Sequence, residues 1–97
     1  MNKRLVIAAA LSLFASPVFA APPSDAQVAE FYKQCMKNSG DNATLCTCKK
    51  EQLPKLVDAE FMTIVLSTME GKALPIEQSK PYGLYISKSN AICAPGM

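Results

Sequence analysis

The chain has 97 residues, a formal net charge of +2, four cysteines and no histidine. Without histidine, neither a Ser-His-Asp nor a Cys-His catalytic site can form, and the commonest zinc ligand is missing. The four glycines are isolated from one another, so the chain has no Gly-rich phosphate-binding loop. The composition therefore predicts that the protein is not an enzyme and that it holds no cofactor and no metal.

Residues 1–20 have the parts of a secretory signal peptide. Lys3 and Arg4 give a positive start, residues 5–15 form a short apolar run, and small residues end the segment at Ala20. The apolar run is too short to cross a membrane, which takes about 20 residues. We therefore expect cleavage after Ala20, a location in the periplasm or outside the cell, and no stable membrane anchor after cleavage.

Residues 21–97 would then form the mature chain, which is predicted to be a single helical domain. This segment has equal numbers of lysine and acidic residues and no arginine. A neutral surface without guanidinium groups is poorly suited to phosphate, so nucleic-acid binding is not expected. A domain of this size has a marginal apolar core, and two disulfide bonds would supply the stability that it lacks.

The clearest amphipathic helix is predicted over residues 25–38. Ser24 and Gln27 have the spacing of a capping box at its start. Apolar side chains then recur at helical spacing on one face, namely Val28, Phe31, Tyr32, Cys35 and Met36. This face is expected to pack on the rest of the domain.

Three more helices are predicted. The second starts near residue 43 and is expected to bend at Pro54, because proline removes a backbone donor inside a helix. The third ends at Gly71, a suitable C-terminal cap. Residues 76–79 are expected to form a short turn, and the fourth helix covers residues 81–93. The predicted fold class is all-α, a small three- to four-helix bundle stapled by disulfides.

The candidate site residues are the four cysteines, Cys35, Cys46, Cys48 and Cys93. Residues two apart on a helix lie about 160° apart around its axis, so Cys46 and Cys48 are expected to face different neighbours. Cys46 shares the apolar face that should meet the first helix, which favours the disulfides Cys35–Cys46 and Cys48–Cys93. The swapped pairing, Cys35–Cys48 with Cys46–Cys93, stays open, whereas a Cys46–Cys48 bond would close a strained ring.

The Cys-x-Cys pair also permits two thiol functions. Cys46 and Cys48 could take part in disulfide exchange, although the usual motif for it is Cys-x-x-Cys at a helix N-terminus. They could also bind Cu(I) together with a methionine sulfur. The methionines available for this are predicted to fill the core instead, and they are Met36, Met62 and Met69.

Two other residue pairs are assigned structural roles. Lys49 and Lys50 are predicted to lie on a solvated face. Tyr82 and Tyr85 fall on the apolar face of the last helix, so they are predicted to belong to the core or its rim rather than to a ligand cage.

The spacing Cys-x10-Cys-x-Cys, followed by the distant Cys93, resembles that of the small four-cysteine helical proteins exported by proteobacteria. The resemblance covers residues 35–93 and implies a disulfide-stapled helical fold. The chain is also similar to the twin Cys-x9-Cys helical hairpins of the mitochondrial intermembrane space, from which it departs in its cysteine spacing. Neither resemblance implies a catalytic residue.

Together these features predict a non-enzymatic periplasmic binding or accessory protein that acts by contact with an unidentified protein. An immunity protein, an inhibitor, a chaperone and a component of an envelope complex are all compatible with them. The alternative is a thiol-active redox or Cu(I)-carrying protein that uses Cys46 and Cys48.

Overall fold

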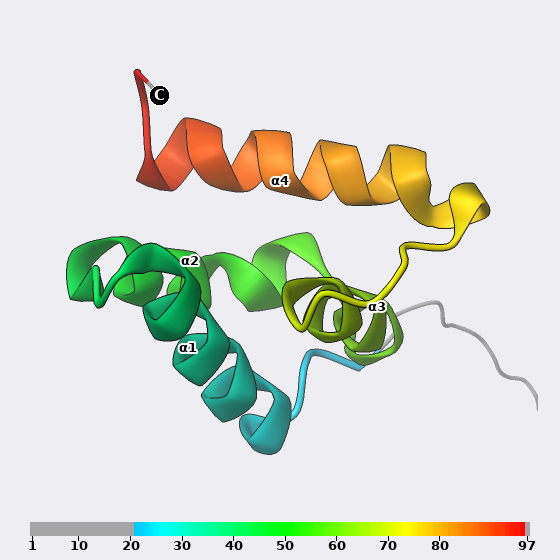
Figure 1. Cartoon of the computed structure of the whole chain (residues 1–97), viewed down its shortest axis with the longest axis horizontal. Helices are drawn as coiled ribbons and strands as arrows, with labels where there is room; N and C mark the ends of the chain where they lie inside the picture. The colour runs from blue at the N-terminus through cyan, green and yellow to red at the C-terminus, as the bar shows by residue number, and fades with distance from the viewer. Residues whose placement is uncertain (1–20, 97) are drawn as a thin grey trace, which may run out of the picture.

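A computed structural model describes residues 21–96. Within that range the chain forms four α-helices and one short 3₁₀ helix, with no strand, so the predicted all-α fold is confirmed (Figure 1). The predicted signal peptide, residues 1–20, lies outside the described residues. None of the helices in the described range is long and apolar enough to span a membrane.

Helix α1 spans Asp25–Ser39 and starts with the predicted capping box. The Ser24 hydroxyl accepts from the backbone N–H of Gln27 at 3.1 Å, and the Gln27 side chain accepts from the N–H of Ser24 at 2.9 Å. After the helix, Gly40 and Asp41 have φ angles of 68° and 66°. Glycine adopts this left-handed conformation freely and aspartate tolerates it, so the chain reverses sharply toward the next helix.

Helix α2 spans Ala43–Leu56, and the side chain of Asn42 caps its start. The helix continues through Pro54 as one element, so this proline does not split it. Pro54 lies in the last turn, and Val57 follows in an extended conformation with φ of −140°. The backbone hydrogen bond that proline removes is therefore lost near the end of the helix rather than in its middle.

Helix α3 spans Ala59–Met69, and Asp58 caps its start. The segment before α1 is attached to this same end. The carbonyl of Ala21 accepts from the N–H of Ala59 at 2.8 Å, and Gln27 Nε2 donates to the carbonyl of Ala59 at 2.9 Å. Hydrogen bonds through one residue thus join the starts of α1 and α3.

A connector leads from α3 through the 3₁₀ helix η2, Ile76–Gln78, to helix α4, Ser79–Cys93. Helix α4 begins two residues before Pro81, which was its predicted start. Proline is compatible with this position, because the first four N–H groups of a helix have no partner within it.

The helices are arranged around α2, which lies between α1 and α4 (Figure 1). Helix α1 packs against both α2 and α3, whereas α4 packs mainly on α2. The buried apolar core contains Phe31, Cys35, Cys46, Leu53, Val57, Met62, Val65 and Tyr85. Helix α4 is thus attached mainly to one neighbour.

Candidate functional site

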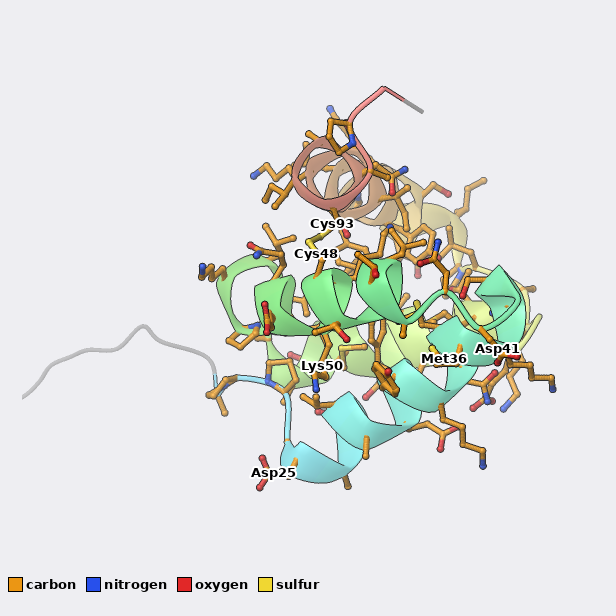
Figure 2. The ribbon with its side chains drawn as sticks, turned by 90° about the vertical axis from the view of Figure 1, so that its left-hand side faces the viewer. Asp25, Met36, Asp41, Cys48, Lys50 and Cys93 are labelled. Carbon is orange, nitrogen blue, oxygen red and sulfur yellow. A yellow bond between two sulfur atoms is a disulfide. The ribbon has the colours of Figure 1, made fainter. Side chains whose placement is uncertain are left out.

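The two disulfides leave α2 on different sides. Cys46 is fully buried and is bonded to Cys35 of α1, while Cys48 is half-buried and is bonded to Cys93 at the end of α4. In each pair the two Cα atoms are 5.7 Å apart. Figure 2 shows Cys48 and Cys93 between α2 and α4. The two-residue spacing thus turns one sulfur toward each neighbour of α2, in keeping with helical geometry.

No cysteine within residues 21–96 is free. The pairing in the structure is the one that the sequence favours, and the swapped pairing does not occur in it. Cys46 and Cys48 are bonded to different helices, so they do not form a neighbouring thiol pair in this state. The four cysteines here fasten α1 and α4 to α2.

The methionines that Cu(I) binding would need are packed in the core. Met62 is fully buried, and Met36 and Met69 pack against the same buried cluster. In the part of the chain that the structure describes, no group of three or more His, Cys, Asp or Glu residues is placed to hold a metal ion. The three methionine side chains thus take part in core packing.

Lys49 and Lys50 are both half-buried, so the prediction of a solvated face is wrong. Lys49 Nζ donates to Asn90 Oδ1 of α4 at 2.6 Å, and burial lowers the pKa of Lys49. Lys50 points the other way, toward α1 (Figure 2), with its Nζ 5.2 Å from the ring centre of Tyr32. That distance is typical of a cation–π contact. Like the two cysteines before them, the two lysines connect α2 to α4 and to α1.

A cavity of about 160 Å³ lies between α4 and the other three helices. Lys49 is the only charged residue that lines it. The walls are mostly apolar and include Phe31, Leu45, Val65, Met69 and Ile86. The site is thus an apolar space, and the ammonium of Lys49 is hydrogen-bonded to Asn90, which is not part of the lining.

Tyr82 and Tyr85 line the same cavity, with their ring centres 6.2 Å apart. Burial raises the pKa of Tyr85 to about 12, and the neighbouring Tyr82 adds to the rise. The nearby Ser89 side chain opposes the rise to a smaller extent. By distance and angle, Ser89 Oγ nevertheless has no hydrogen-bond partner among the described residues. Burial also raises the pKa of Tyr82. Both phenols are therefore protonated near neutral pH, and both residues belong to the core and its rim as predicted.

The opposite flank of α4 has exposed apolar side chains. Leu84 is 56% exposed and Ile92 is 50% exposed, and the exposed Lys88 lies between them. The three residues recur every four positions, so they form one stripe along the helix, which we call the α4 stripe. Leu84 and Lys88 also border a hollow of about 250 Å³ whose lining includes Leu56 and Phe61.

Comparison with protein-family models, with curated proteins and with solved structures finds no match to this chain. The resemblance to exported four-cysteine proteins therefore stays a prediction. Helix α4 thus presents two surfaces, the stripe on one flank and the cavity on the other.

Sequence reasoning missed both surfaces. The four-residue period of Leu84, Lys88 and Ile92, beside the core face of the last helix, was the signal that could have revealed the stripe. The cavity had no such signal. The contact of Lys49 with Asn90 joins residues 41 positions apart, and it depends on how α4 packs on α2.

Proposed function

We propose that the protein is a non-enzymatic binding protein of the periplasm, or of the outside of the cell, that acts by contact with another protein. The predicted signal peptide would deliver the chain to an oxidising compartment, where disulfides form and persist. Toxin immunity, enzyme inhibition, chaperoning and assembly of an envelope complex all fit this proposal.

The α4 stripe is the observation that carries the proposal. Leu84 and Ile92 are at least half exposed, on a helix that the Cys48–Cys93 disulfide holds in place. Apolar side chains at i and i+8 of a helix are suited to an apolar groove on a partner. A helix that is already fixed loses little conformational freedom on binding, which favours affinity.

The charge of α4 indicates the chemistry of the partner surface. Lys80 and Lys88 are both exposed, and the helix contains no acidic residue. Opposite charges around an interface steer association and fix orientation. The expected partner surface is therefore an apolar patch bordered by acidic side chains.

The proposal is tested by placing a photo-crosslinking amino acid at Leu84 or Ile92 of the full chain in cells. Both positions should give an adduct of the same mass with the same partner, and Lys33, exposed on α1, should give none. Leu84→Glu should abolish the adduct at Ile92, because it would place a carboxylate against an acidic partner surface. Lys33→Glu is the matched control and should leave that adduct intact.

Two results would contradict this function. One is the absence of any adduct at the stripe, and the other is an equal yield at Lys33. Intact mass with and without alkylation is measured on the same protein purified from cells. Free thiols at Cys46 and Cys48 would favour the alternative, a redox or Cu(I)-carrying protein.

A further inference from the structure

The lining of the cavity between α4 and the other helices includes one charged residue that has no carboxylate partner. Lys49 is half-buried and is the only charged residue in the lining. Within residues 21–96, no carboxylate oxygen lies within 4.0 Å of Lys49 Nζ, and the one ion pair in that range joins Lys72 to Glu70. Packing of the four helices alone does not require a lysine in this lining.

Lys49 also has more hydrogen-bond donors than its one protein partner, Asn90, accepts. An ammonium group has three N–H donors, and Asn90 Oδ1 accepts one of them at 2.6 Å. The amide of Asn90 is neutral, so it leaves the charge unbalanced, and burial lowers the pKa of Lys49. A bound anion would supply the missing negative charge and accept the remaining donors.

The rest of the cavity fits a compact apolar group. Its volume is about 160 Å³, and an apolar cavity of about 150 Å³ in another protein is large enough to hold benzene. Tyr82 and Tyr85 add two phenols that are protonated near neutral pH, because burial raises both pKa values. Neutral phenols do not repel an anion.

We propose that this cavity binds a small monocarboxylate, with an apolar body of about benzene size beside Val65 and Ile86 and the carboxylate at Lys49 Nζ. One carboxylate matches the charge of the one lysine in the lining. A phosphate group would bring more negative charge and more oxygens than a single lysine satisfies. The cavity lies on the flank of α4 away from the α4 stripe, so this inference does not depend on the proposed protein contact.

Phenylacetate is a suitable probe because it joins one benzene ring to one carboxylate. Titration of the oxidised protein, followed by amide NMR, should give saturable shifts that cluster at Lys49, Ile86 and Asn90. Phenylacetamide has nearly the same shape without the charge, and acetate has the charge without the ring. Each should bind at least roughly tenfold more weakly than phenylacetate. Phenylacetamide lacks the charged hydrogen bond, and acetate lacks the contacts of the ring.

Two neighbouring lysines provide matched variants. Lys49→Met keeps the apolar stem and removes the ammonium, so it should weaken phenylacetate binding roughly tenfold or more and leave phenylacetamide binding unchanged. Lys50→Met removes the next ammonium on the same helix, which lies over the Tyr32 ring. It should leave both affinities unchanged. Ile86→Phe adds volume to the cavity wall and should weaken the binding of both ligands.

Equal affinities for phenylacetate and phenylacetamide would overturn the proposal. An equal loss of phenylacetate affinity in Lys49→Met and Lys50→Met would overturn it as well. An absence of saturable shifts, or shifts that cluster on the α4 stripe, would overturn it too. Circular dichroism and thermal unfolding of each variant separate a loss of binding from a loss of folding. If Lys49→Met does not fold, the comparison of the two ligands on the unaltered protein decides the question.

Discussion

Ser89 lies fully buried on α4, and its hydroxyl has no hydrogen-bond partner among the described residues. At the scale of single residues, such a group is a source of instability, since an unpaired buried hydroxyl costs about 1–3 kcal/mol. Ser89→Ala should therefore raise the free energy of unfolding by about 1 kcal/mol in a denaturant titration. Ser87→Ala, exposed on the same helix, is the control and should stay within about 0.5 kcal/mol. A loss of stability in Ser89→Ala would mean that the hydroxyl is paired in solution.

Tyr85 should make the protein sensitive to alkaline pH. Its phenol has a pKa of about 12 in the folded protein, against 10.0 for an ordinary tyrosine. Between these values the unfolded chain binds fewer protons, so the free energy of unfolding falls as the pH rises. The fall should reach roughly 1.4 kcal/mol near a pH of about 11.

The measurement is a pair of urea titrations, at roughly pH 9 and roughly pH 11, on the unaltered protein and on Tyr85→Phe. The variant lacks the phenol of Tyr85. Its free energy of unfolding should therefore fall less between the two pH values than that of the unaltered protein. An equal fall in the free energy of unfolding in both proteins would contradict the assignment of this pKa to burial of Tyr85.

At the scale of helices, the Cys48–Cys93 disulfide fixes the far end of α4, a helix that packs mainly on α2. It spans 45 residues, against 11 for Cys35–Cys46. From chain entropy alone, replacing both cysteines of a pair by alanine should cost about 4 kcal/mol for the long loop and about 3 kcal/mol for the short one.

Hydrogen exchange gives the more specific readout for these two variants. Loss of Cys48–Cys93 should lower the protection of α4 amides before those of α1 to α3, because α4 packs mainly on α2 and would be free to open separately. Loss of Cys35–Cys46 should instead lower the protection of α1. Uniform loss of protection over all four helices in both variants would show that α4 does not open separately.

Much of the helix layout follows from local signals in the sequence. Ser24 with Gln27 predicts the start of α1, and the glycines at positions 40 and 71 mark two helix ends with positive φ. The local signal was less reliable at Pro81, which was predicted to start the last helix, whereas α4 begins at Ser79, two residues earlier. Pro54 was predicted to bend the second helix, and it lies in the last turn of α2, just before Val57 packs into the core.

The candidate sites were harder to predict than the helices. The directions of Cys46 and Cys48 follow from residue spacing on one helix, so they could be argued from the sequence. The cavity, by contrast, is lined by Tyr82 and Ile86 of α4 and by Val65 of α3. Its position depends on how these helices pack, which no local sequence pattern predicts. Lys49 was predicted to be solvated, because its hydrogen-bond acceptor, Asn90, lies on a different helix and is distant in sequence.

At the scale of the whole molecule, the two disulfides together contribute about 7 kcal/mol by the same chain-entropy reasoning. That figure is comparable to the total stability of a typical domain, about 5–15 kcal/mol. The reduced and alkylated chain should therefore lack a cooperative thermal transition in circular dichroism, whereas the oxidised protein should show one. A cooperative transition in the reduced chain would show that the apolar core is sufficient for folding.

The disulfide connectivity also bears on how the protein matures. The first cysteine of the chain is bonded to the second, and the third to the fourth. If the chain enters an oxidising compartment with its N-terminus first, Cys35 and Cys46 arrive first and are native partners. Cys48 arrives next and stays unpaired until its partner Cys93 arrives. An oxidase that joins cysteines in their order of arrival would thus produce the native bonds directly, whereas the swapped pairing would need thiol–disulfide rearrangement. Biogenesis of this protein should accordingly require a disulfide oxidase and proceed without a disulfide isomerase.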